Sequence, residues 1–273
     1  MSSETPTQTG SQAVERALAI LELLRNASGE LGVHEIARRL NLRPPTVHRL
    51  LQALARHGLV QRHPTRRTYG LGWKLVDYAN VVIHNTQYAA EADDIVKGLR
   101  DLTGETAALQ VRVGFDRVCV VEYESHQDLR RSMGVGRRIP LHAGSSGRAI
   151  LAFLEPGELS FILKTSPPRP SNDYDVLEIS TIHRLLEETR QTGYAQSEPR
   201  EERVAGIAAL STPFFQFNGI VAGALSISGP SVRWTRAARQ RYVPDLLRAG
   251  QELSRRLGSQ RWFPWYERSD AAS

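Results

Sequence analysis

The sequence predicts an α+β protein of two domains, and three observations lead to this prediction. The first 72 residues hold three short amphipathic helical patterns followed by two strand-like segments. From residue 88 onward, helical and strand-like patterns alternate irregularly, as they do around a mostly antiparallel sheet. The length of 273 residues exceeds the usual size of one domain and suits two.

Residues 1–11 are polar, lack the basic and apolar regions of a secretion signal, and are expected to be a disordered lead-in. The chain has no run of about 18 apolar residues, so we expect no membrane-spanning helix. Its single cysteine, Cys119, cannot form an internal disulfide or a cysteine-based zinc site. These features predict a cytoplasmic protein without a metal or another cofactor.

Residues 12–72 are predicted to form a winged helix-turn-helix. The last of its three helices begins at Pro44 and Pro45, which suit a first helical turn, and ends near Gly58. The segment His63–Arg67 joins two short strands into a hairpin, which is the wing. The expected elements are helices over 12–25, 34–40 and 44–56 and strands over 59–62 and 68–71.

The basic charge of the chain is concentrated in this domain. Residues 31–70 carry eight arginines against one acidic residue, Glu35. Such a block is typical of a protein that binds a polyanion, although a solvated charged face would look the same. Since the second helix of a helix-turn-helix enters the major groove, Arg49 is placed to reach a guanine, and wing arginines suit the DNA backbone or the minor groove. The residues expected to contact double-stranded DNA are Arg43, Pro45, Thr46, His48, Arg49, Gln52, Arg66, Arg67 and Tyr69.

A helix over residues 73–87 is expected to link the domains. It has apolar residues on more than one side, Trp73 and Ile83 among them, so it either packs onto its own domain or joins two copies of the chain. A dimer would suit the paired half-sites that such regulators read.

Residues 88–260 are expected to form the α+β domain, and residues 261–273 a tail whose aromatic segment Trp262–Tyr266 has no assigned role. The expected helices cover 90–102, 148–154, 179–193 and 242–258, with one more beginning at Pro156. The expected strands cover 106–113, 117–123, 129–135, 207–213 and 220–228.

No catalytic motif of the HExxH, GxSxG, GxGxxG or Walker type occurs, so no catalytic residue is assigned and an enzyme is not expected. His142 is the only histidine placed where chemistry could occur, and its expected role is a structural hydrogen bond. Two alternatives stay open. One is an enzyme acting on a small organic acid, and the other is an architectural protein that binds DNA without sequence preference.

Six segments of the chain resemble the IclR family of bacterial transcription regulators, in the order expected for that family. They are Val14–Leu21, Thr46–Leu51, Tyr69–Gly72, Val135–His142, Ser146–Ala149 and Ala224–Pro230. The resemblance extends over residues 12–258. It implies a GAF-like effector domain, a homodimer or dimer of dimers, and a regulator of a catabolic operon whose operator affinity responds to a small molecule. It does not separate a repressor from an activator.

The resemblance also implies an effector pocket formed by the loop before Ser146 and the last two strands. Ser145 and Ser146 would offer backbone N–H groups to a ligand carboxylate, since helix N-termini attract anions. Ser226 and Ser228 alternate along one strand, so their hydroxyls point the same way. The residues expected to contact the effector are Met133, Leu141, Ser145, Ser146, Gly147, Ala209, Ser226 and Ser228.

Three positions depart from the family pattern. Many members have cysteine where this chain has Ala209, some have an acidic residue at Pro199, and lysine is frequent at Arg148. Because two polar ligand groups are missing, the sequence favours a larger and more apolar effector, such as an aromatic acid, over a very small keto acid such as glyoxylate.

Overall fold

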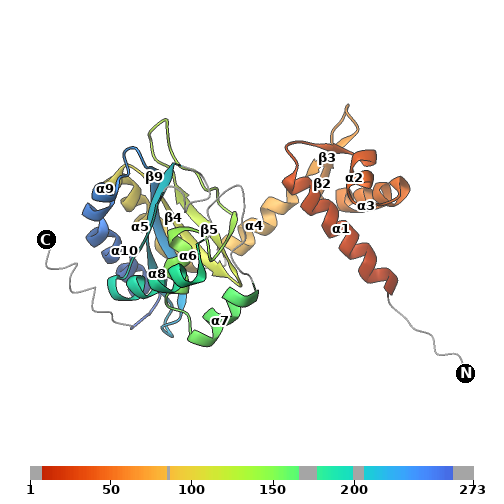
Figure 1. Cartoon of the computed structure of the whole chain (residues 1–273). Coiled ribbons are helices and arrows are strands. Elements are labelled where there is room, and N and C mark those ends of the chain that lie inside the picture. The colour runs from red at the N-terminus through yellow and green to blue at the C-terminus, as the bar shows by residue number, and fades with distance from the viewer. Residues whose placement is uncertain (1–7, 85–86, 166–176, 199–205, 261–273) are drawn as a thin grey trace, which may run out of the picture. The chain divides into compact units, whose positions relative to one another are not determined.

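A computed structural model describes residues 8–84, 87–165, 177–198 and 206–260. The chain divides into two compact units, Met1–Ile83 and His84–Ser273 (Figure 1). Pro199, the first seven residues and the aromatic tail lie outside the described residues. In the described part of the chain, no helix combines the length and apolar character needed to cross a membrane.

The first unit has three helices, a small sheet and a fourth helix, which confirms the helix-turn-helix prediction. Its elements are α1 Gln8–Asn26, β1 Leu31–Gly32, α2 Val33–Arg39, α3 Pro44–Arg56, β2 Val60–Arg62, β3 Thr68–Leu71 and α4 Lys74–His84. The strands pair antiparallel in the order β1-β3-β2. The core forms where the apolar stripe of α3, Val47 and Leu51 included, packs on Ile20 and Ile36.

Helix α1 begins at Gln8, inside the segment expected to be disordered. Apolar periodicity reveals only the part of this helix that packs on the core. The first residues of the helix form a polar extension, so the sequence pattern did not indicate them. In that extension Ser11 donates a hydrogen bond to the Glu15 carboxylate (3.5 Å), four residues along the helix. Strand β1 has two residues, too few to leave a sequence pattern.

A close backbone approach fixes the start of α4. Gly72 N–H donates to Leu59 O (2.9 Å), and a side chain at Gly72 would place its Cβ 2.1 Å from Gly58 O. Only glycine fits there. The wing therefore returns tightly against the end of α3 before α4 begins.

The second unit is an α+β domain around one six-stranded sheet, as predicted. Its elements are α5 Gln87–Thr103, β4 Thr106–Val113, β5 Asp116–Tyr123, β6 Arg138–Pro140, α6 Gly144–Leu151, α7 Pro156–Thr165, α8 Ile179–Thr192, β7 Ala195–Ser197, β8 Ile207–Phe215, β9 Val221–Pro230, α9 Arg236–Arg241 and α10 Val243–Arg256. The strand order is β6-β5-β4-β9-β8-β7, and every pair is antiparallel.

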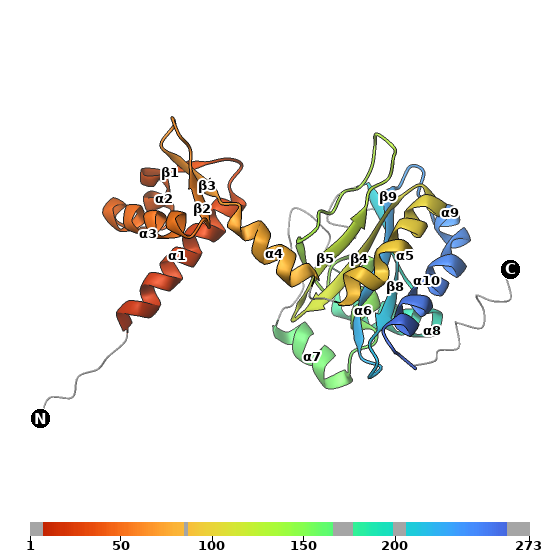
Figure 2. The same cartoon turned by 180° about the vertical axis from the view of Figure 1, so that it is seen from behind.

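The helices cover opposite faces of this sheet, with α5 and α10 on one and α6 on the other (Figures 1 and 2). Alternation along β8 explains the division. Thr212 points at Gly250 of α10, whereas its neighbour Ser211 bonds to Ser145 of α6. Each face of the buried strand β8 therefore receives a helix.

The strand expected over residues 129–135 is wrong, because this segment is a loop. The Glu122 carboxylate accepts hydrogen bonds from the backbone N–H groups of Met133 (2.9 Å) and Gly134 (3.2 Å). Gly134 and Gly136 have φ values of 86° and 83°, which bend the chain out of strand geometry. The edge strand next to β5 is β6 instead. Helix α6 also begins earlier than predicted, at Gly144 rather than Arg148.

Candidate DNA-binding face and effector site

Helix α3 presents a polar face because its apolar residues are used inside. Val47, Leu50, Leu51 and Leu54 are buried, so His48, Arg49 and Gln52 are exposed. The helix starts at Pro44, and the carbonyl of Arg43 accepts the N–H groups of Thr46 (3.0 Å) and Val47 (3.2 Å). Arg43 and Pro45 are exposed and Thr46 is half-buried.

A surface hollow of about 590 Å³ joins this face to the wing. It is lined by His48, Arg49, Gln52, Ala55, Arg56, Arg62 and Tyr69. Arg62 of β2 lies opposite Tyr69 of β3, which brings the base of the wing beside α3. Tyr69 is only 5% exposed and belongs to the core, so it supports this face more than it extends from it.

The hollow contains two arginines that the sequence analysis did not single out, Arg56 and Arg62. The helical period gave a signal for Arg56, which lies seven residues after Arg49 and therefore on the same face. Arg62 becomes adjacent only through the pairing of β2 with β3.

The wing turn carries Arg66 and Arg67, both exposed and outside the lining of the hollow. His63 shapes the turn, because its Nδ1 accepts the backbone N–H groups of Thr65 and Arg66, both at 3.3 Å. Arg67 has a φ of 54°. Glu35 of α2 is the one acidic residue among residues 31–70. Its carboxylate accepts hydrogen bonds from Arg38 and Arg39, which lowers its pKa.

A buried polar network occupies the sheet face under the N-terminus of α6. The Ser211 hydroxyl lies 2.8 Å from that of Ser145 and 2.9 Å from that of Ser146. Gln110 Nε2 donates to the hydroxyls of Ser146 (2.8 Å) and Ser226 (2.9 Å). Three of the serines expected at the effector site therefore share one network.

Arg117 extends this network to the loop before α6. Its Nε donates to Gln110 Oε1, and its Nη1 donates to the carbonyls of Pro140 (2.7 Å) and Ala143 (2.8 Å). The same loop approaches Gly147, where a Cβ would lie 1.9 Å from Leu141 O. Leu141 itself is fully buried in the main core.

An apolar cluster adjoins the serines on this face. It consists of Ala108, Cys119, Met133, Ile139 and Ala143. Ala108 and Ser226 are register partners, and the Ser226 hydroxyl donates to Ala108 O (3.3 Å). Burial raises the pKa of the Cys119 thiol to about 12, so it stays protonated at neutral pH and is a poor nucleophile.

Ala209 and Ser228 lie opposite one another on β8 and β9, two residues from Ser211 and Ser226. They share the face of the network, and the N–H of Ala209 donates to the Ser197 hydroxyl (3.1 Å). Ser211, Gln110 and Arg117 were not predicted from the sequence. A glutamine within the apolar strand over 106–113 was the available signal for Gln110.

Two family models match the chain. The one described as bacterial transcriptional regulator IclR C-terminal matches residues 80–255, and the IclR helix-turn-helix domain matches residues 13–64. The chain is 30% identical over 259 residues to the HTH-type transcriptional repressor AllR of Escherichia coli (strain K12), with 94% of each chain covered. It is 30% identical over 245 residues to the HTH-type transcriptional regulator BhcR of Paracoccus denitrificans, covering 90% of this chain and 87% of that protein.

Solved structures of the IclR family have the same fold as this chain. The crystal structure of Thermotoga maritima IclR superposes with a TM-score of 0.74 at 29% identity, covering 91% of this chain and 99% of that one. An IclR homolog from Microbacterium hydrocarbonoxydans, solved with 4-hydroxybenzoate, has the same fold at a TM-score of 0.74 and 21% identity, covering 90% of this chain and 98% of that one. The chain therefore belongs to the IclR family of bacterial transcriptional regulators, with a helix-turn-helix domain and a C-terminal effector-binding domain.

Proposed function

We propose that this regulator acts in the cytoplasm as a homodimer or dimer of dimers and binds paired half-sites upstream of a catabolic operon. It represses that operon until a small organic acid, preferably an aromatic one, binds the second unit. The observation that carries the proposal is the hollow where α3 and the wing meet, lined by Arg49, Arg56 and Arg62.

The DNA-binding part is supported by the geometry of the first unit. Three arginines and His48 of this hollow come from two elements and share one surface. A helix in the major groove places such side chains against base edges, while the exposed wing arginines meet phosphates or the minor groove. Arg49 is the preferred base-reading residue because it is exposed near the start of α3.

The dimer is supported by apolar side chains of the first unit that nothing covers within the described part of the chain. On and beside α4, Trp73 is 77% exposed and Val81 is 59% exposed. On α1, Val14 and Leu18 are also exposed. Side chains of this kind are expected to pack against the same surface of a second copy.

The effector site is supported by the two kinds of surface on the α6 face of the sheet. The backbone N–H groups at the start of α6, around Ser145 and Ser146, suit a carboxylate. The cluster that contains Met133 and Ile139 suits an apolar or aromatic body. Ala209, small and apolar, lies on the same face, which agrees with a bulky effector better than with glyoxylate.

We infer that the chain regulates rather than catalyses. An enzyme acting on an organic acid would need an activated nucleophile or an acid–base pair on this face. The Cys119 thiol has its pKa raised to about 12, and the hydroxyls of Ser145, Ser146 and Ser226 bond to another serine or to the Gln110 amide, none of which is a general base. Effector binding would instead favour one arrangement of the dimer, which changes the fit of the two recognition helices to the half-sites.

The test is fluorescence anisotropy with duplex DNA from upstream of the protein's own gene and a scrambled duplex at two salt concentrations. Arg49→Ala is expected to raise Kd for the upstream duplex by about 5- to 150-fold, the range that one bidentate base contact supplies. Arg25→Ala is the control, because Arg25 is an exposed arginine of α1 outside the hollow. Wild-type affinity in Arg49→Ala would contradict the assigned face.

The same assay tests the effector. Adding 4-hydroxybenzoate is expected to weaken binding to the upstream duplex, whereas glyoxylate has no effect. Ser228→Ala should reduce the response without changing DNA affinity in the absence of acid. A response to glyoxylate alone would overturn the preference for an aromatic acid. Chemical conversion of either acid during incubation with the protein would favour the enzyme alternative.

A further inference from the structure

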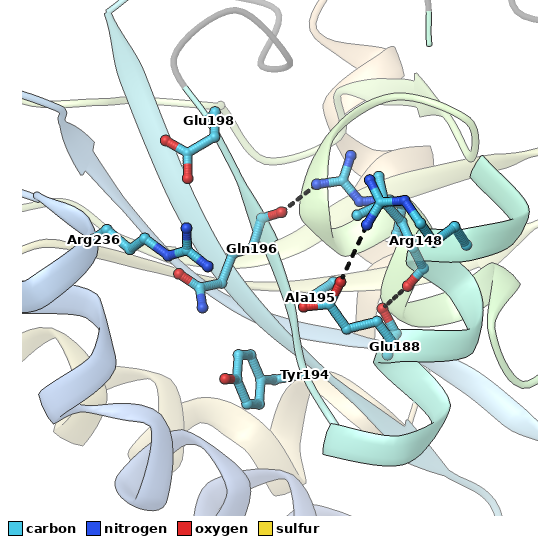
Figure 3. Close-up of a pocket in the computed structure, with 10 residues that line it drawn as sticks. Arg148, Glu188, Tyr194, Ala195, Gln196, Glu198 and Arg236 are labelled. Carbon is cyan, nitrogen blue, oxygen red and sulfur yellow. Dashed lines mark hydrogen bonds and ion pairs between the residues drawn. The ribbon is translucent and has the colours of Figure 1, made fainter. Parts of the chain in front are cut away.

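A second hollow, of about 270 Å³, lies beside the edge strand β7, away from the serine network. It is lined by Arg148, Arg184, Leu185, Glu188, Thr189, Tyr194, Ala195, Gln196, Glu198 and Arg236. Figure 3 shows Arg236 extending from one side toward Gln196, with Tyr194 and Glu198 on either side of the Gln196 side chain. None of the serines of the network lines it.

Three hydrogen-bond donors from two elements meet here without a partner in the described part of the chain. They are the guanidinium of Arg236 on α9 and, on or beside β7, the hydroxyl of Tyr194 and the amide nitrogen of Gln196. Arg239 Nε donates to Gln196 Oε1 (3.2 Å), which leaves Gln196 Nε2 as the amide atom available to a ligand.

The hollow also has an excess of positive charge. Its two carboxylates already lie against arginines: Glu198 is 2.9 Å from Arg239, and Glu188 is 3.8 Å from Arg184. Arg148 also lines the hollow, is only 2% exposed, and donates to the carbonyl of Gln196. Among the described residues, the lining therefore combines three guanidinium groups with two carboxylates, and Arg239 beside Glu198 adds a fourth positive charge next to the hollow.

We propose that this hollow binds a small hydroxylated anion at a site separate from the α6 effector site. The phosphate or carboxylate group contacts the guanidinium of Arg236 and the donors of Tyr194 and Gln196, as oxyanions do in charge-assisted hydrogen bonds. The hydroxyl groups of the ligand donate to the carboxylate of Glu188. The negative charge of Glu188 would repel a second anionic group on the ligand. A volume below the range of about 300–1,000 Å³ for drug-sized ligands fits a molecule of a few carbon atoms.

Such a ligand would act on the same helix as the effector. Arg148 belongs to α6 and follows Ser145 by three residues, which is about one turn. A molecule held at Arg148 and β7 would therefore contact one side of α6 while the effector contacts its N-terminus.

Isothermal titration calorimetry of the full chain tests the proposal, with gluconate and glycerol 3-phosphate as the anions and glycerol as the neutral control. One or both anions should bind with one site per chain, and glycerol should not. Which anion binds identifies carboxylate or phosphate as the preferred group.

Arg236→Gln and Tyr194→Phe test the site. Arg236→Gln is expected to weaken binding about tenfold or more, and Tyr194→Phe less. Arg241→Gln is the matched control, because it removes an exposed arginine from the same helix outside the hollow. Ser228→Ala should leave binding unchanged.

Four results would overturn the proposal. The first two are no binding of either anion and wild-type affinity in Arg236→Gln. The third is an equal loss of affinity in Arg241→Gln, which would indicate unspecific attraction. The fourth is a loss of binding in Ser228→Ala, which would place the anion at the effector site. Circular dichroism of each variant checks that it is folded.

Discussion

At the scale of single residues, the effector unit depends on polar groups buried in its core. Gln110 is 1% exposed, and both ends of its amide are used: Oε1 accepts from Arg117 and Nε2 donates to two serines. Burial of such groups is tolerated because their hydrogen bonds are complete, and each unmade bond would cost about 1–3 kcal/mol. Their side chains are therefore fixed in place before any ligand arrives.

Gly147 gives a prediction at the same scale. Gly147→Ala should lower the free energy of unfolding by about 1–3 kcal/mol, because the new Cβ would lie 1.9 Å from Leu141 O and force α6 from its loop. Gly98→Ala in α5 is the matched control: nothing lies within 4 Å of its Cβ position, so it should raise stability by about 0.5–1 kcal/mol. Urea unfolding measures both, and equal stability of the two variants would contradict the close approach.

At the scale of elements, α5 and α10 are joined by one arginine. Arg256 donates to Asp94 of α5 at 2.7 and 2.9 Å and to Glu252 of its own helix at 2.9 Å. Hydrogen bonds from Arg255 and Arg256 lower the pKa of Glu252 to about 2, and a bond from Arg256 lowers that of Asp94. The arginine therefore stabilises the charged form of both carboxyl groups.

The sign of this shift predicts an acid dependence. Because the folded-state pKa of Glu252 is lowered, its contribution to stability is present above pH 4.5 and is lost as the pH falls toward about 2. Glu252→Gln should therefore show a smaller drop in Tm between pH 6 and pH 3 than the wild type. The corresponding difference in the free energy of unfolding is expected to be below about 1 kcal/mol, because the groups are partly exposed.

Scanning calorimetry at the two pH values measures the effect. Glu91→Gln in α5 is the control, because the Glu91 side chain makes no hydrogen bond or ion pair among the described residues. An unchanged pH dependence in Glu252→Gln would show that the ion pair contributes nothing in solution.

Long helices and strands were predicted from the sequence more accurately than short ones. Helix α3 has the bounds the sequence predicted, because two prolines fix its start, Gly58 adopts a φ of 70° after its end, and thirteen residues carry a clear apolar stripe. Strands β1, β6 and β7 and helix α9 were missed, since two to six residues are too few to show a period.

At the scale of the whole molecule, the proposed dimer predicts a role for the exposed apolar residues of the first unit. The double variant Trp73→Ser/Val81→Ser is expected to shift sedimentation velocity toward a smaller species and to weaken operator binding, while far-ultraviolet circular dichroism stays unchanged. The two side chains are 77% and 59% exposed, so removing them leaves no cavity in the chain itself.

A matched control removes two equally exposed apolar residues from the second unit. Phe217→Ser/Val232→Ser should keep the wild-type mass, since these side chains, 74% and 80% exposed, lie outside the proposed interface. If Trp73→Ser/Val81→Ser also keeps it, the chain associates through another surface.

From the sequence we predicted the two-domain α+β fold, the helix over residues 44–56 with Arg49 on its polar face, and, through the family resemblance, the serines before Arg148. The fold and this helix have local signals, such as helical period, strand alternation or a helix-starting residue. Contacts between residues far apart in the sequence could not be predicted in this way. Gln110 and Ser226 are 116 residues apart and bond across β4 and β9, and the hollow at β7 combines Arg148, Tyr194 and Arg236. Such contacts depend on strand order and helix packing, which no local periodicity records.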